Sequence, residues 1–85
     1  MFYIYVLESI KYGNFYTGYT INLKSRLKLH NQGLIFSTKP YLPWKLIYYE
    51  ACLDENDAKR REHYLKTTQG HRLLRRRLKD YFYNS

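Results

Sequence analysis

Cysteine is almost absent from this 85-residue chain, which contains only Cys52. A disulfide within the chain and a cysteine-based metal site are therefore excluded, and the thiol is expected to act as a small buried apolar group. No apolar run approaches the roughly 20 residues that cross a bilayer, so we expect no membrane partner. The N-terminus also lacks the pattern of a signal peptide. These features predict a protein of the reducing cytoplasm.

Acidic residues are also scarce: 7 Asp and Glu face 15 Lys and Arg, which gives a net charge of +8. On so small a chain this charge makes nucleic acid the first partner to consider, ahead of an anionic membrane, with a basic protein that has no such partner as the alternative. The length allows one domain, covering 1–85, with a modest core. We therefore expect a two-layer α+β fold.

Tyrosine is abundant, with eleven residues, and two tyrosine-rich runs near the N-terminus predict a β-hairpin. The runs cover 2–7 and 15–19, and a Gly-Asn turn lies between them. The expected register places Tyr5 opposite Gly18 and puts Tyr5 and Tyr16 on one face of the sheet. A slip by one residue would separate the two phenols. The first run is apolar on both faces, so we expect it to be the central strand.

A helix is predicted between Asn22, a favourable N-cap, and Gly33, a favourable C-cap. Two leucines mark its buried stripe, and Arg26 and His30 fall beside that stripe, four residues apart. Each has a structural alternative. Arg26 can lie at the border and extend to water, and His30 can be a core residue with satisfied hydrogen bonds.

The segment 34–43 contains two prolines and is predicted to be a loop. Its Lys39 is a candidate phosphate contact, with a solvated lysine as an equal alternative. A third strand is predicted over 44–50, and alternation predicts a shared face for Trp44, Leu46 and Tyr48. The simplest arrangement is a three-stranded antiparallel β-sheet flanked by helices, in the order β-β-α-β-α-α.

Asp54 is predicted to open a second helix, on which Glu62 shares the apolar stripe. A buried carboxylate must find a cation, a metal or a proton. The alternative is an ion pair along the helix with Lys59 or Lys66. Because both lysines point further outward than Glu62, we favour a functional role for the carboxylate.

Gly70 is predicted to end the second helix, and a last helix is predicted from about His71 to Tyr83. Four cations recur on one side of it at i, i+3, i+4 and i+7 spacing: Arg72, Arg75, Arg76 and Lys79. Such a stripe would follow a phosphate backbone, and the alternative is a charged solvent face.

The candidate residues suit phosphodiester cleavage, which needs a base, a group that holds the phosphate, and positive charge. Arg26 could donate to phosphate oxygens in a planar fork. Tyr16 or Tyr5 could act as the base if a metal or cation assists ionisation of a phenol whose pKa is ordinarily about 10. His30 could relay the proton or steady a phenol. Glu62 could anchor one Mg²⁺.

The triplets Tyr-Ile-Tyr, ending at Tyr5, and Tyr-Thr-Gly, ending at Gly18, resemble the signature of the GIY-YIG nuclease superfamily. In that family two hairpin tyrosines, an arginine with a His or Tyr four residues on, and one metal-binding Glu form the active site. The resemblance implies these roles for Tyr5, Tyr16, Arg26, His30 and Glu62. It also implies Mg²⁺ or Mn²⁺, and 5′-phosphate and 3′-hydroxyl products. The chain looks like the small stand-alone bacterial branch, some of whose members resemble single-stranded DNA nucleases.

Two positions depart from the family pattern. The first triplet begins with Tyr3 rather than glycine, which a strand tolerates. A late asparagine carried by many members is not evident, and its window holds 75–77, three arginines. Either the site is altered, or Arg76 replaces the asparagine.

We therefore predict a DNA endonuclease that acts on single or double strands, with RNA as a further substrate to test. A monomer or weak homodimer is expected as the active form. Its rivals are a nucleic-acid-binding module without catalysis and an adaptor of a DNA repair complex.

Overall fold

A computed structural model describes residues 1–84 of the chain. The elements follow in the order β1 (Phe2–Ser9), β2 (Phe15–Thr20), α1 (Leu23–Asn31), the 3₁₀ turn η1 (Lys39–Tyr41), β3 (Trp44–Cys52), α2 (Glu55–Leu65), α3 (Thr68–Arg77) and α4 (Lys79–Tyr83). The strands form one antiparallel sheet in the order β2-β1-β3. The predicted α+β class and the central position of the first strand are confirmed. Within the described residues, no helix has the length and apolar character to span a membrane.

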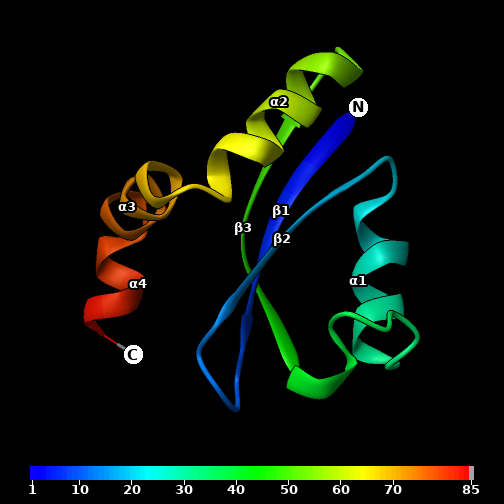
Figure 1. The fold of residues 1–85 in the computed structure, drawn as a ribbon, viewed down its shortest axis with the longest axis vertical. Helices are drawn as coiled ribbons and strands as arrows, with labels where there is room; N and C mark the ends of the chain where they lie inside the picture. Colours follow the sequence, from blue (N-terminus) through cyan, green and yellow to red (C-terminus); the bar gives the residue numbers. More distant parts are fainter. Residues whose placement is uncertain (85) are drawn as a thin grey trace.

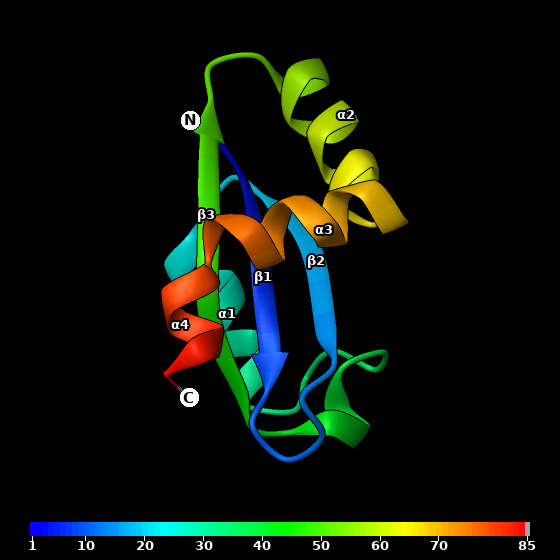
Figure 2. The ribbon, with the colours of Figure 1, turned by 90° about the vertical axis from the view of Figure 1, so that its left-hand side faces the viewer.

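The helices lie on both faces of the sheet. In Figure 1, α1 lies on one side of the strands and α3 and α4 lie on the other. Figure 2 shows α3 crossing in front of the sheet while α1 lies behind it. Each face has its own buried cluster. On the α1 face it consists of Tyr5, Leu7 and Trp44. On the face covered by α2 and α3 it consists of Ile4, Val6, Ala58, Leu65 and Leu74.

The hairpin has the predicted register, with Tyr5 opposite Gly18 and Leu7 opposite Tyr16. A Cβ atom added to Gly18 would lie 2.4 Å from both the Cζ and the hydroxyl oxygen of Tyr5. The phenol ring of Tyr5 therefore lies directly over the backbone of its neighbouring strand. Only glycine leaves room for that position, which explains why the second triplet ends as it does.

Both predicted caps of α1 are present. The side chain of Asn22 accepts a hydrogen bond from the Ser25 N–H at 3.1 Å. Gly33 has a φ of 72°, and its N–H donates to the carbonyl of His30 at 3.1 Å. A left-handed residue just after the last turn is the usual way to end a helix on a glycine. The two caps fix where Arg26 and His30 fall along α1.

A bulge in β3 changes the face of one predicted residue. Val6 pairs with Tyr48, but the next residue, Leu7, pairs with Leu46, so β3 carries one extra residue at this point. An extra residue reverses the alternation of side chains beyond it. Trp44 and Leu46 share a face as predicted, the one covered by α1, whereas Tyr48 packs on the opposite face. The prediction of one shared face is therefore wrong for Tyr48.

The C-terminal helices differ from the prediction in two places. Gly70 does not end the second helix: it lies in the first turn of α3, where its N–H donates to the side chain of Thr67 at 3.1 Å. The predicted continuous helix from about His71 to Tyr83 is also interrupted at Leu78, which separates α3 from α4. The Thr67 side chain caps the start of α3 by accepting the Gly70 N–H. The glycine is therefore not a helix-ending residue, and its lack of a side chain has another explanation.

Gly70 allows close packing between α2 and α3. A Cβ atom on Gly70 would lie 2.2 Å from the carbonyl oxygen of Tyr64 and 2.6 Å from the Cα of Leu65. Both atoms belong to backbone, which cannot move aside as a side chain can. The absence of a side chain at this position therefore sets how tightly α3 folds back on α2.

We predict that Gly70→Ala lowers the free energy of unfolding by about 2 kcal/mol, because overpacking a tight contact typically costs about 1–3 kcal/mol. Alanine has the better helix propensity by about 1 kcal/mol, so a net loss would show that the contact dominates. Urea unfolding followed by circular dichroism measures the change. Gln69→Ala, at the exposed neighbouring position, is the control and should stay within about 0.5 kcal/mol of the parent. A Gly70→Ala protein as stable as the parent would contradict this explanation of the glycine.

Candidate active site

A buried hydrogen bond joins the central strand to α1. The hydroxyl of Tyr5 lies 2.7 Å from Nε2 of His30. Tyr5 is 1% exposed and His30 is fully buried. The sequence predicted both as site residues from the hairpin register and from the position of His30 beside the buried stripe. The structure brings them into direct contact across 25 residues of sequence.

Burial keeps this pair uncharged near neutral pH. Burial, with smaller contributions from Tyr16 and Glu62, raises the pKa of Tyr5 to about 12, and a hydrogen bond from the Arg26 guanidinium and its charge partly oppose this shift. Burial and, to a smaller extent, the positive charge of Arg26 lower the pKa of His30 to about 4. In the folded protein the phenol therefore keeps its proton, and the imidazole is neutral.

The second nitrogen of His30 also has a partner. Its Nδ1 lies 2.8 Å from the hydroxyl oxygen of Thr38, which is fully buried. The sequence analysis assigned Thr38 to a loop and gave it no role. Because the segment is irregular, no periodicity indicates where a side chain eight residues beyond His30 points. Only tertiary structure reveals this contact.

Tyr16 and Arg26 complete the group on the α1 face. The ring of Tyr16 lies 5.1 Å from the ring of His30 and 6.3 Å from that of Tyr5, measured between centroids. The Nε atom of Arg26 is buried and has no hydrogen-bond partner among residues 1–84. A buried donor without a partner costs free energy, and an anionic acceptor such as a phosphate oxygen would remove that cost.

Glu62 reaches the same region from α2. Its neighbours along the helix stripe, Ala58 and Leu65, are buried, and the side chain of Glu62 is 18% exposed. The carboxylate pairs with Lys66 at 3.3 Å, so the ion pair expected as the structural alternative is present. The Glu62 carboxylate is also close enough to Tyr5 to raise the pKa of that phenol.

Glu62 is the one acidic residue identified at this site. Within residues 1–84, no group of three or more His, Cys, Asp or Glu side chains is arranged to hold a metal ion. A cation bound here would depend on one carboxylate and several water molecules. Mg²⁺ tolerates that arrangement because it dehydrates reluctantly and takes few protein ligands.

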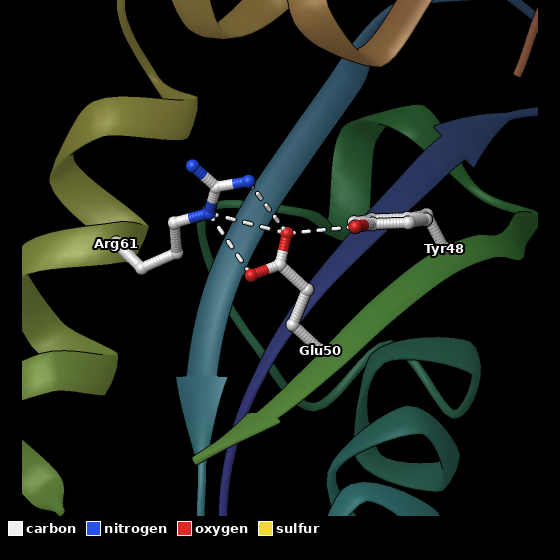
Figure 3. Close-up of polar contacts among 3 residues, drawn as sticks. All are labelled: Tyr48, Glu50 and Arg61. Atoms are coloured by element: carbon white, nitrogen blue, oxygen red, sulfur yellow. Dashed lines mark hydrogen bonds and ion pairs between the residues drawn. The ribbon is translucent and has the colours of Figure 1, made fainter. Parts of the chain in front are cut away.

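The bulge in β3 has a consequence for α2, shown in Figure 3. It turns Tyr48 and Glu50 toward this helix, where Nε and Nη2 of Arg61 donate to the two carboxylate oxygens of Glu50, each at 2.9 Å. The Tyr48 hydroxyl donates to the same carboxylate at 2.7 Å. Although burial raises the pKa of Glu50, these hydrogen bonds lower it overall. The sequence does not predict this network, because the network depends on the bulge.

The predicted nucleic-acid contacts are divided among α3, α4 and η1. A groove of about 540 Å³ on α2 and α3 is lined by Tyr64, Gln69, Arg72, Arg75 and Arg76. The guanidinium of Arg75 also stacks 5.4 Å from the ring centroid of Phe15. Lys39 is exposed on η1, and Lys79 lies on α4. The stripe predicted on one helix is therefore divided between α3 and α4, and only its three arginines share a groove.

We predict that the stability of the fold falls between pH 6.5 and pH 4 because of His30. The pKa of this residue is lower in the folded state than its ordinary value of 6.5, so the unfolded chain takes up the proton first as the pH falls. The stabilisation is present above pH 6.5 and is lost progressively down to pH 4, with a total effect of up to about 3 kcal/mol.

Urea unfolding at several pH values measures this effect. The His30→Gln variant is the control, since it cannot titrate at this position and should lose stability less steeply over the same range. Parallel pH profiles for the two proteins would contradict the prediction.

Comparison with known proteins gives the family. The family model of the GIY-YIG catalytic domain matches residues 1–75. A UPF0213 protein of Clostridium perfringens is 40% identical over 67 residues, which cover 78% of this chain and 71% of that protein. A UPF0213 protein of Streptococcus agalactiae is 46% identical over 61 residues, which cover 71% and 68%.

A solved structure agrees with this result. The solution NMR structure of a UPF0213 protein from Bacillus halodurans has 31% sequence identity and a TM-score of 0.54, and the match covers 87% of this chain and 82% of that one. Members of the matched family are generally endonucleases that use divalent metal ions. The chain therefore belongs to the GIY-YIG family and groups with its small bacterial UPF0213 proteins.

Proposed function

We propose that this protein is a metal-dependent endonuclease that hydrolyses DNA phosphodiester bonds. The observation that carries the proposal is the convergence of five side chains from four elements. Tyr5 and His30 share a hydrogen bond, Tyr16 packs against both rings, and Arg26 and Glu62 lie close enough to shift the pKa of Tyr5. Family membership supports the reaction class.

Arg26 is the residue that would bind the scissile phosphate. Its buried Nε donor has no partner in the described part of the chain, and a guanidinium donates to two phosphate oxygens in a planar fork. Glu62 is the residue that would hold Mg²⁺ or Mn²⁺, for which a half-buried carboxylate is a suitable hard oxygen ligand. The bound ion would offset charge on the phosphate and lower the pKa of a coordinated water. Lys66, now paired with Glu62, would give up that ion pair.

Tyr16 is the better candidate for the base. The pKa of Tyr5 is raised to about 12 mainly by burial, so Tyr5 keeps its proton at neutral pH. Tyr16 is half-buried and lies beside it. We therefore assign proton removal from water to the phenolic oxygen of Tyr16, with Tyr5 orienting the water. His30 steadies the Tyr5 phenol, because an imidazole with a pKa of about 4 is a poor proton carrier at neutral pH.

The reaction is a hydrolysis by in-line attack. The oxygen of water forms a bond to phosphorus as the bond to the 3′ oxygen breaks, which leaves a 5′-phosphate and a 3′-hydroxyl. One water proton passes to Tyr16, and the 3′ oxygen takes a proton from solvent or from a water of the site. The charge that builds on the phosphate would be balanced by Arg26 and by the bound cation.

The arginine groove on α2 and α3 is a candidate contact for the DNA strand beyond the scissile phosphate. It presents three guanidinium groups beside the ring of Tyr64, and an aromatic ring next to cations is typical of surfaces that bind a single strand. We assign Lys79 and Lys39 outlying phosphate contacts. Because Arg76 lines this groove, we propose that it holds a flanking phosphate rather than replacing the family's late asparagine.

We also propose that 1–85 forms one domain and acts as a monomer or weak homodimer in the bacterial cytoplasm. The family match ends at residue 75, but the segment that follows packs on the hairpin. The ring of Phe82 lies 5.6 Å from that of Phe15, and the hydroxyl of Tyr81 donates to Glu8.

We predict that Glu62→Gln abolishes cleavage of labelled DNA in Mg²⁺, with a loss of at least about 100-fold, while DNA affinity in chelator changes less than about threefold. The amide keeps the size of the side chain but is a poor ligand for a hard cation. Lys66→Gln is the matched control, since it removes the other half of the ion pair and should retain cleavage.

Full cleavage by Glu62→Gln would contradict the assignment of the metal ligand. If the parent protein binds DNA but does not cut it in either metal, the chain is a binding module, and the proposed activity is wrong. If a protein partner is captured from cells and remains bound after nuclease digestion, the adaptor role is supported instead.

We predict that Arg72→Ala combined with Arg76→Ala weakens DNA binding and flattens its salt dependence. Loss of two phosphate contacts should reduce the slope of log K against log salt by about 2. The control removes the same charge elsewhere, by Lys11→Ala combined with Lys59→Ala. Fluorescence anisotropy at several salt concentrations distinguishes them, and equal slopes for the two double variants would rule out the groove as a specific contact.

A further inference from the structure

We infer that Thr38 is a positioning residue, which fixes the tautomer of His30 and thereby directs the hydroxyl proton of Tyr5 away from the substrate. The inference rests on the proposed function for its catalytic consequence, but its structural claim stands on three hydrogen bonds. The hydroxyl of Thr38 donates to the Ile35 carbonyl at 3.3 Å, its oxygen lies 2.8 Å from Nδ1 of His30, and Nε2 of His30 lies 2.7 Å from the Tyr5 hydroxyl.

The direction of this chain follows from counting protons. A carbonyl oxygen can only accept, so the single hydroxyl proton of Thr38 is used at Ile35. With that proton placed at Ile35, we infer that the oxygen of Thr38 accepts from His30 and that the proton of the imidazole is on Nδ1. A neutral imidazole carries one such proton. Nε2 is therefore an acceptor, and Tyr5 must donate to it.

The orientation of the Tyr5 hydroxyl matters for the chemistry. With its proton committed to His30, the oxygen of Tyr5 presents only lone pairs toward Arg26 and the substrate. It can accept a hydrogen bond from an attacking water and hold that water beside Tyr16. The opposite tautomer of His30 would donate to Tyr5 and turn the phenol proton outward. Tyr5 would then donate to the phosphate and lose its hold on the water.

Thr38 is itself held from two sides. Its carbonyl accepts from the indole N–H of Trp44 at 2.9 Å, and its backbone N–H donates to Ile35 at 3.1 Å. The backbone N–H of Trp44 in turn donates to the side chain of Asn31, at the end of α1, at 3.0 Å. Because α1 also carries His30, the loop residue and the histidine are fixed to the same frame. A group that only filled space would not need this orientation.

The test compares Thr38→Val, which keeps the shape of the side chain but removes the hydroxyl, with Thr38→Ser, which keeps the hydroxyl. Nitrogen-15 NMR of the His30 imidazole at pH 7 reports the tautomer directly. We expect the proton on Nδ1 in the parent protein and in Thr38→Ser, and a shift toward Nε2 in Thr38→Val. In the DNA cleavage assay, Thr38→Val should lower kcat roughly 10-fold or more with little change in KM, since small misplacements in an active site can cost about 100-fold.

Two outcomes would overturn the inference. A parent protein with the proton on Nε2 would do so even if Thr38→Val failed to fold. A folded Thr38→Val that keeps the proton on Nδ1 and the parent kcat would show that Thr38 only fills space. Failure of the proposed function looks different: the parent would not cleave DNA, while the tautomer measurement would still decide the role of Thr38.

Discussion

The hydrogen bond between the Tyr5 phenol and the His30 imidazole is the contact on which the candidate site depends. It joins the central strand of the sheet to α1. The ring of Tyr5 can reach this position because Gly18, over which it lies, has no side chain. Both groups are buried and uncharged, and each would be costly to bury without the other. Tyr16 and Arg26 are arranged around this pair, so the geometry of the α1 face follows from one interaction.

The candidate site draws side chains from the helices that cover the two faces of the sheet. Residues of β1 alternate between the two clusters, with Tyr5 on the α1 face and its neighbours Ile4 and Val6 on the face covered by α2. The fork between Arg61 and Glu50 holds α2 against β3, and the next residue on that helix is Glu62. Successive helical positions are about 100° apart, so Arg61 can anchor the helix to β3 while Glu62 takes a different direction, close enough to Tyr5 to raise the pKa of its phenol. An 85-residue chain can thus combine groups from two layers without a second domain.

The sequence predicted the local structure that positions the candidate site residues. The hairpin register follows from turn chemistry and alternation, and the caps at Asn22 and Gly33 place Arg26 and His30 on α1. These features depend on residues close together in the chain.

The features that the sequence did not predict depend on tertiary contacts. The bulge in β3 reflects how that strand packs against two layers, and it creates the network around Glu50. Gly70 is required by the close approach of α2 and not by the end of a helix. Thr38 lies in an irregular segment, where no period indicates which side chain points inward. Glu62 is an intermediate case. The sequence predicts its position on the apolar stripe of the second helix, but only the tertiary structure shows that it lies close to Tyr5.

The most direct test of the central claim is cleavage of end-labelled single- and double-stranded DNA by the parent protein, with Mg²⁺ or Mn²⁺ and with chelator. The account predicts internal cuts that leave 5′-phosphate ends, formed with either metal and absent in chelator. DNA that is bound but intact in both metals would contradict it and leave the basic surface as the functional part of the molecule.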